Sequence, residues 1–308
     1  MRKKITILIV TCILLHLLIF PKQTALYTAQ GLTLWYRQVV PTLLPFCILS
    51  YIIIQTDLYH SLFQKLERIL PERFCQSTES LYPICMGMVC GFPIGSKLTD
   101  DLYRLGHLHD DQVTRLCAIS NQFGPAFLVN YALISQLHLE QGWKLLLPAV
   151  YLPPLVSGFL WYLFSSRDKT DSIHKKPVSQ SQLNVKIIDT GIINGFETML
   201  RIAGYIVIFS IISGMIQQLS MVSETGKALM AGLCEITTGI QKLSAVSLPV
   251  RLKLTLISGI VPFGGFCGLF QTKAMMRHTP FSTAAYVRFK LCCSLMGMCI
   301  SYALFPFL

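Results

Sequence analysis

The chain has 308 residues, of which 53% are hydrophobic and only 13% are charged, and its mean hydropathy is +0.55. Soluble domains usually carry about 25% charged residues, so this composition excludes an ordinary soluble protein and predicts an all-α polytopic membrane protein. The formal net charge of +11 arises largely from basic residues in the predicted loops, a pattern that sets membrane topology and argues against nucleic-acid binding.

The first part of the chain predicts two membrane spans and two helices of mixed polarity. Residues 5–20 follow a basic start and are expected to form the first span. Residues 24–36 are mixed in polarity and predict a helix along the membrane surface. Residues 39–55 predict the second span, and residues 58–73 predict an amphipathic cytoplasmic helix.

The next part contains two interrupted apolar stretches. Residues 81–91 are too short to cross a membrane and predict one arm of a re-entrant hairpin. Residues 97–115 are polar and are expected to return to the cytoplasm as a connector. Residues 116–137 predict a span broken by glycine and proline, and residues 143–164 predict the next span. A polar, basic linker follows at residues 165–182.

The second half predicts a similar series of elements. Residues 187–200 predict a surface helix and residues 202–219 a span. Residues 228–243 predict a second hairpin, and residues 252–270 a second broken span. Residues 291–308 predict the last span, preceded by a cytoplasmic loop whose basic residues are Lys273, Arg277, Arg288 and Lys290.

Constant sequence offsets relate the two halves. Gly31 and Gly195 differ by 164 positions, and Phe123-Gly124 and Phe263-Gly264 differ by 140. Cys90 and Gly95 stand 144 positions before Cys234 and Gly239. With the loop charges, this pattern predicts an inverted repeat of membrane helices with re-entrant or broken helices. The expected division is an N-terminal helix in residues 1–29, a first repeat in 30–164, a linker in 165–186 and a second repeat in 187–308.

The breaks are the candidate binding site, because a freed backbone is tolerated at membrane depth only where it is buried or lines a cavity. The exposed N–H groups at the start of a half-helix suit an anionic ligand. The candidate substrate-binding residues are Gly91, Pro93, Gly95, Ser96, Lys97, Asn121, Gln122, Gly124, Pro125, Glu235, Thr237, Thr238, Gly239, Gly264 and Gly265.

Several of these side chains also have an ordinary structural interpretation. Lys97 either contacts the ligand or extends to the membrane surface. Glu235 is either a functional carboxylate, an interfacial one or a partner for Lys97. Asn121 and Gln122 either bind the ligand or cap the following half-helix. The hydroxyls of Thr237 and Thr238 either bind the ligand or satisfy freed backbone groups, and Gln271 either lines the exit or faces the loop.

Enzymatic and metal-binding signals are weak. No nucleophile elbow, phosphate loop or HExxH motif is present, and residues 107–111, with two histidines and two aspartates, predict a solvated loop. The eleven cysteines include no CxxC pair, and most lie in apolar runs, where we expect them to pack as small apolar residues. The sequence therefore predicts no catalytic residue, cofactor or bound metal.

Four motifs resemble a known family: residues 91–97 (GFPIGSK), 121–125 (NQFGP), 235–239 (EITTG) and 263–265 (FGG). The chain from about residue 30 onward is similar to the YlbJ-type sporulation integral membrane proteins, which carry a nucleoside-recognition, or Gate, domain. Gln122 departs from the asparagine that we expect at that position in many members.

The resemblance implies a role in endospore formation, in the outer forespore membrane of a bacterium, where the protein would move dipicolinate from the mother cell toward the forespore. A small planar dianion is compatible with half-helix N-termini, a lysine and hydroxyls, although these groups do not select it over other carboxylates. Two alternatives stay open: a non-transporting assembly or gating subunit, and a nucleoside carrier. The expected partners are the substrate, the lipid bilayer and a possible second copy of the chain.

Overall fold

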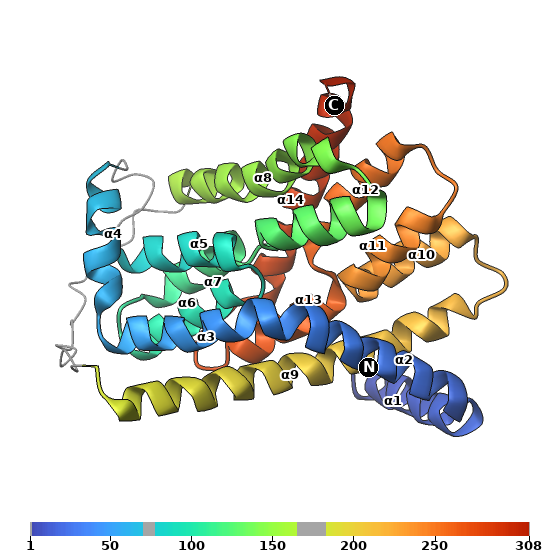
Figure 1. Ribbon diagram of the computed structural model, residues 1–308, viewed down its shortest axis with the longest axis horizontal. Coiled ribbons are helices and arrows are strands. Elements are labelled where there is room, and N and C mark those ends of the chain that lie inside the picture. The colour runs from blue at the N-terminus through green and yellow to red at the C-terminus, as the bar shows by residue number, and fades with distance from the viewer. Residues whose placement is uncertain (1, 70–77, 165–182, 308) are drawn as a thin grey trace.

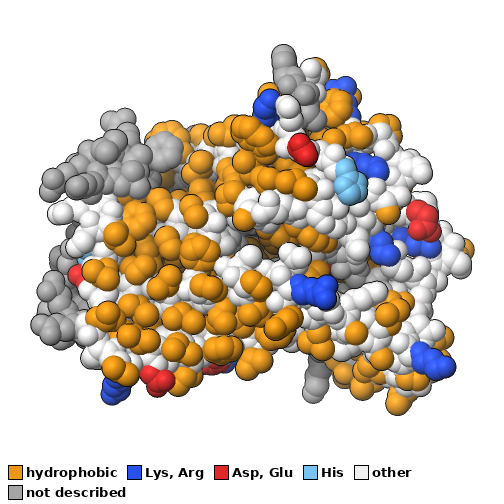
Figure 2. Space-filling view, viewed as in Figure 1, with side chains coloured by type: hydrophobic (Ala, Val, Ile, Leu, Met, Phe, Trp, Pro, Cys, Tyr) orange, Lys and Arg blue, Asp and Glu red, His pale blue; other side chains and the backbone are white. Residues whose placement is uncertain are grey.

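The protein is built from helices. The computed structural model describes residues 2–69, 78–164 and 183–307, and these ranges contain helices, turns and irregular segments but no strand. Five helices in the described residues are long and apolar enough to cross a membrane: Pro21–Gln55, Glu140–Leu163, Val185–Gln217, Val250–Met275 and Thr283–Leu304. Apolar side chains cover much of the face in Figure 2, and the few charged ones lie mainly toward its edges. The prediction of an all-α polytopic membrane protein is confirmed.

The first half begins with a long continuous rod. A π-helical turn, η1 (Trp35–Val39), joins α2 (Pro21–Leu34) to α3 (Val40–Gln55) without a break. The predicted separation of a surface helix over residues 24–36 from a second span is therefore wrong. Pro41 directly follows the π-helical turn, in which the Val40 amide donates to the Trp35 carbonyl, and this wider turn lets the helix continue through the proline. The predicted first span lies in α1 (Arg2–Ile19), and its crossing of the membrane stays a prediction.

The remaining helices of the first half include a hairpin and an interrupted helix (Figure 1). The amphipathic segment forms α4, and its predicted end lies outside the described residues, as does the linker over 165–182. The elements are α4 (Leu58–Ile69), α5 (Thr78–Cys90), α6 (Ile94–Arg104), α7 (Asp110–Ser120), the π-helix η2 (Phe127–Leu137), the short η3 (Glu140–Gly142) and α8 (Trp143–Phe164).

The second half repeats this order. It starts with α9, one unbroken helix over Val185–Gln217, so the predicted division into a surface helix and a span is wrong here too. A hairpin, an interrupted helix and a closing helix follow. They are α10 (Glu224–Cys234), α11 (Ile236–Ala245), α12 (Val250–Phe263), α13 (Gly265–Met275) and α14 (Thr283–Leu304), with the short η4 (Phe305–Phe307) after α14.

Equivalent elements of the two halves pack against each other. The rod of α2 and α3 lies beside α9 and runs in the opposite direction (Figure 1), and the Trp35 indole donates to the Met199 carbonyl at 3.0 Å across this contact. Helix α8 packs against α14. The second arm of each hairpin contacts the broken helix of the other half, α6 with α13 and α11 with η2. Such reciprocal contacts between the two halves are expected for a twofold repeat. The domain boundaries stay predictions.

The glycines that relate the hairpins by sequence offset are sites of close packing. A Cβ on Gly95 would lie 2.6 Å from the Ser120 carbonyl, and one on Gly239 would lie 2.1 Å from the Gly232 Cα. Both hairpins therefore bring backbone against backbone. Gly95 and Gly239 hold this packing and do not line the cavity described below.

Three segments that were predicted to form a polar connector or polar loops contain helical or buried residues. Residues 97–104, expected in a returning connector, form most of α6, with Ser96, Thr99 and Asp100 buried. His107, expected in a solvated loop, is only 8% exposed. Lys290, expected in a cytoplasmic loop, lies inside α14 and is 2% exposed. Such polar groups are buried in part because α7 packs against both α6 and α14.

Candidate functional site

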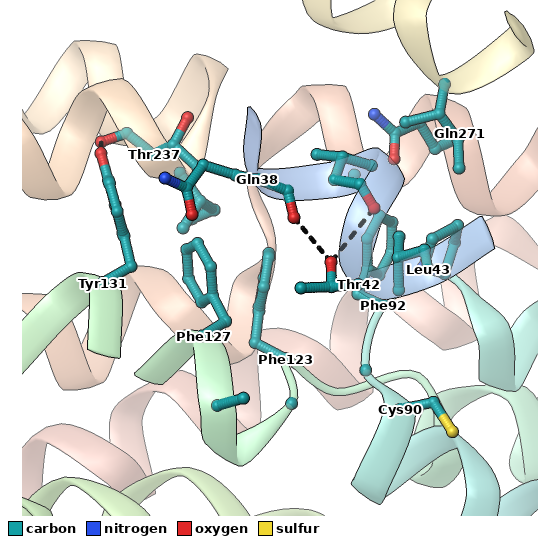
Figure 3. Close-up of a pocket in the computed structure, with 18 of the residues that line it drawn as sticks. Gln38, Thr42, Leu43, Cys90, Phe92, Phe123, Phe127, Tyr131, Thr237 and Gln271 are labelled. Atoms are coloured by element: carbon teal, nitrogen blue, oxygen red, sulfur yellow. Dashed lines mark hydrogen bonds between the residues drawn. The ribbon is translucent and has the colours of Figure 1, made fainter. Parts of the chain in front are cut away.

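A cavity of about 330 Å³ lies between the α2–α3 rod and the helix breaks (Figure 3). One wall is formed by side chains of η1 and α3, among them Gln38 and Thr42. The opposite wall is formed by both hairpin tips and both broken helices, which contribute Phe92, Phe123 and Glu235. The cavity thus lies where segments distant in sequence converge, as expected for a site in a protein with broken helices.

Four helical segments begin at this cavity. Phe92 and Pro93 precede α6, Gly124 precedes the segment that starts at Pro125, and Gly264 precedes α13. Glu235 precedes α11 and also lines the cavity. Each helix start carries N–H groups without an intrahelical acceptor and the positive end of the helix dipole. The backbone therefore surrounds the cavity with four partly positive ends.

The start of α11 differs from the other three because a carboxylate already occupies it. Glu235 is 6% exposed, and its oxygens accept from the amides of Thr237 at 2.9 Å and Thr238 at 2.8 Å, and from both threonine hydroxyls. No side-chain cap bond is present at the starts of α6 or α13 within the described residues, and Gly124, which precedes the segment beginning at Pro125, has no side chain that could cap it. Hence three starts remain available to a ligand, and the fourth is closed by its own side chain.

Aromatic rings form a row along one wall. The centroids of Phe92 and Phe123 are 5.5 Å apart, those of Phe123 and Phe127 are 5.1 Å apart, and those of Phe127 and Tyr131 are 5.1 Å apart. Figure 3 shows Phe123 and Phe127 side by side, with Gln38 and Thr42 across the cavity from them. The Tyr131 hydroxyl ends the row and donates to the Thr237 carbonyl at 2.9 Å. These ring faces offer a flat apolar surface.

The polar groups of the opposite wall were not predicted, apart from Gln271. The Thr42 hydroxyl bonds to the carbonyls of Gln38 and Val39 (Figure 3). Gln271 is buried and lines the cavity instead of facing the loop, and its place at an exit stays a prediction. The signal for the Gln38–Thr42 wall was present in Pro41 and in Pro45, which lies inside α3, because prolines in an apolar helix often accompany local π-helical geometry.

The structure brings six of the predicted residues to the cavity wall. They are Gly91, Pro93, Gly124, Glu235, Thr237 and Gly264. The others lie next to the breaks but not on the wall: Gly95, Ser96, Lys97, Asn121, Gln122, Pro125, Thr238, Gly239 and Gly265. Substrate contact by any of these residues stays a prediction.

The polar residues of this second group have partners within the protein. The Lys97 ammonium lies 2.8 Å from the Asp101 carboxylate on its own helix, so it is neither at the surface nor beside Glu235. The Ser96 hydroxyl donates to the Pro93 carbonyl at 2.7 Å. The Gln122 amide donates to the carbonyls of Ala118 and Ile119, so it closes the end of α7 instead of capping the following half-helix.

Asn121 joins the first break to the second half. Its amide donates to the Thr272 hydroxyl at 2.9 Å and the Tyr286 hydroxyl at 3.1 Å, and its main-chain carbonyl accepts from the Lys290 ammonium at 2.6 Å. Its side-chain oxygen is buried without a partner. Sequence reasoning missed Lys290 because the nearby Arg288 and Lys273 made the segment resemble a basic loop. No group of three or more metal-ligating side chains occurs in the described part of the chain.

Comparison with known proteins gives one informative similarity. The chain is 23% identical over 283 residues to the sporulation integral membrane protein YlbJ of Bacillus subtilis (strain 168), and the match covers 81% of this chain and 69% of that protein. No family model and no solved structure matches the chain. The similarity supports a relationship to YlbJ-type sporulation membrane proteins, as the resemblance implied. The Gate domain stays a prediction.

Proposed function

We propose that this chain is a membrane carrier of a small organic anion and that dipicolinate, moving from mother cell toward forespore during sporulation, is its substrate. The observation that carries the proposal is the cavity bordered by four helix starts. In secondary transporters the N-terminal ends of broken helices point at anionic groups of the substrate. The similarity to YlbJ, whose name describes a sporulation integral membrane protein, supports a setting in a membrane of a sporulating cell, and we propose that this is the outer forespore membrane.

The charge distribution supports an anion over a cation. Glu235 is the sole acidic residue among the described residues that line the cavity, and four donors already satisfy its carboxylate. No described lining residue is basic, so attraction for an anion would come from the backbone. Each helix start contributes roughly half a positive charge, and three of them lack a capping side chain.

The shape of the cavity supports a planar substrate. The row from Phe92 to Tyr131 supplies flat apolar faces, while amide and hydroxyl groups of Gln38, Thr42 and Gln271 lie on the cavity wall. A planar ring with carboxylates at its edge would place the ring against the aromatic row and the carboxylates at the helix starts. Dipicolinate has this form. Transport would follow alternating access, with one hairpin and broken helix moving relative to the other.

The test is uptake of dipicolinate by liposomes that contain the purified protein, followed with a luminescent lanthanide trapped inside. We expect saturable uptake. Phe123→Leu, which removes a ring face from the cavity, should raise the half-saturation concentration by about tenfold, equivalent to about 1.4 kcal/mol. The matched control is Phe270→Leu, because Phe270 is 52% exposed and does not line the cavity. It should leave uptake unchanged.

The same assay separates the alternatives. Absence of uptake by a protein that is monodisperse and folded would contradict the carrier and favour an assembly or gating subunit. If added uridine abolishes dipicolinate uptake, the result would favour a nucleoside carrier. Lys97→Ala should have little effect on half-saturation, because the Lys97 ammonium pairs with Asp101 and does not line the cavity.

A further inference from the structure

The most unusual charge in the described part of the protein is Lys290. It is 2% exposed and lies within α14, which is apolar and long enough to cross a membrane. Its ammonium donates to the Asn121 main-chain carbonyl at 2.6 Å. A buried ammonium is costly in a membrane protein and persists only where surrounding groups compensate its lost hydration.

The compensation comes from dipoles and from an aromatic ring. The Tyr286 ring centroid lies 5.5 Å from the Lys290 ammonium, within the range of a cation–π contact. Cys117 and Cys293, on α7 and α14, are the other titratable side chains close to it. No carboxylate lies within ion-pair distance of Lys290 among the residues that the structure describes. A positive charge is thus held without a formal negative partner.

The position of the ammonium explains why it is tolerated. Asn121 is the residue at which α7 ends, and the negative end of that helix dipole lies there. The chain then runs without helical structure to Gly124, which lines the cavity. In transporters with broken helices, the unwound carbonyls and C-terminal half-helix ends are where a coupling cation binds. The Lys290 ammonium occupies such a position.

We propose that the Lys290 ammonium is a tethered cation that fills a cation site at the break between α7 and η2, so that this site takes no free Na⁺ or K⁺. This proposal is independent of the proposed transport function. It concerns the cation that lies at the break between α7 and η2, whether or not the cavity binds an anion. The second half has no equivalent. The offset of 140 residues that relates Phe123 to Phe263 places Val150 at the position of Lys290 and Val261 at that of Asn121.

The test uses thermal unfolding of the purified full-length protein in detergent, with choline, sodium, potassium or methylammonium chloride at equal ionic strength. Wild type should melt at the same temperature in all four salts. Lys290→Ala empties the site and should melt about 5 °C lower in choline, because a buried carbonyl loses its donor. Methylammonium, which matches the end of the missing side chain, should restore at least half of that loss.

Two variants control for packing and for general salt effects. Lys290→Met fills the space without a charge and should melt below wild type in every salt. Lys273→Ala removes an exposed lysine from α13 and should show no salt-specific change. The proposal is overturned if sodium or potassium stabilises wild type more than choline does, or if Lys290→Ala melts with wild type in choline. It is equally overturned if Lys290→Met has the same melting temperature as wild type. This result counts even if Lys290→Ala does not fold.

Discussion

The two helix breaks have the same place in the two halves but are made by different chemistry. At the first, between α7 and η2, polar side chains satisfy the freed backbone: Gln122 bonds to two carbonyls of α7, and Lys290 bonds to the carbonyl of Asn121. At the second, between α12 and α13, Gly264 and Gly265 turn the chain with φ angles of +82° and +68°. A backbone interruption can therefore be stabilised by side-chain donors or by conformational freedom.

The two hairpins also differ, but in the opposite sense. Glu235 caps α11 at the second hairpin tip, whereas the first tip, Gly91 to Pro93, has no side-chain cap on α6. The repeat is thus symmetric in packing and asymmetric in electrostatics. The difference suggests that a ligand would meet the uncapped starts of α6, of the segment that begins at Pro125 and of α13, while the start of α11 is mainly structural. Four predictions can break or sharpen this comparison.

The largest effect should come from the feature that the hairpins share. Gly239→Ala would place a Cβ 2.1 Å from the Gly232 Cα, and Gly95→Ala would place one 2.6 Å from the Ser120 carbonyl. Each should lower the free energy of unfolding by about 3 kcal/mol, because backbone cannot move aside as a side-chain tip can. Gly204→Ala in α9, where a Cβ meets nothing within 4 Å, is the control and should be neutral or stabilising. Unfolding in mixed micelles measures all three, and wild-type stability of Gly239→Ala would contradict the close packing.

Glu235→Gln tests the electrostatic asymmetry between the hairpins. It removes a negative charge beside the cavity and turns one acceptor oxygen into a donor facing the amides of α11. We expect unfolding to become easier by about 2 kcal/mol while the affinity for an anionic ligand increases. Calorimetric titration with dipicolinate, paired with thermal unfolding, separates the two effects. A variant that loses both stability and affinity would mean that Glu235 itself contacts the ligand.

Replacing the turn glycines compares how each half makes its bend. Gly264→Ala adds a Cβ with 4.0 Å to the nearest Phe123 atom, so the backbone strain at φ +82° is the main cost, about 1 kcal/mol. Gly91→Ala adds the same strain at φ +93° and also brings its Cβ to 2.7 Å from the Gly124 amide nitrogen. It should therefore cost more than Gly264→Ala in the same unfolding assay. If both variants lose the same free energy of unfolding, the backbone near Gly124 must be able to move away from the added Cβ at little cost.

The smallest effect should come from single hydrogen bonds between neighbouring segments. Tyr131→Phe removes the bond to the Thr237 carbonyl that ties η2 to α11, and it should cost about 1 kcal/mol. Tyr151→Phe removes a hydroxyl whose single proton is shared between the carbonyls of Phe123 at 2.6 Å and Met88 at 3.2 Å, and both carbonyls lose it, so its loss should be the larger of the two. The reverse order, measured by unfolding, would mean that the second hairpin depends more on this contact than the first break does.

The sequence predicted the features that depend on local chemistry. Glycine and proline at residues 91–95, 124–125, 239 and 264–265 marked each interruption, and the structure has a break or a close backbone contact at each of them. The apolar run before residue 164 gave α8 with its observed bounds. These features were predictable because they need no knowledge of distant partners.

The parts that could not be predicted depend on partners remote in sequence. Lys290 is buried only because Asn121, 169 positions away, supplies its acceptor. Gln38 and Thr42 line the cavity because α3 lies across from the breaks. Likewise, the mixed polarity of residues 24–36 suggested a surface helix, although Gly31 packs against Ser210 of α9. Hydropathy reports the preference of a segment for lipid or water, and it does not report a neighbouring helix.

The rod of α2 and α3 has 35 residues and α9 has 33, so each is about 50 Å long at 1.5 Å per residue. The hydrocarbon core of a bilayer is about 30 Å thick, so neither helix fits upright within it. Both must lie steeply inclined or extend beyond the acyl chains, and their mutual packing makes the two inclinations interdependent. Lipid chain length should consequently change the inclination of these two helices. In a thicker bilayer the α2–α3 rod and α9 should lie closer to the membrane normal, and the width of the space beside α3 should change with them.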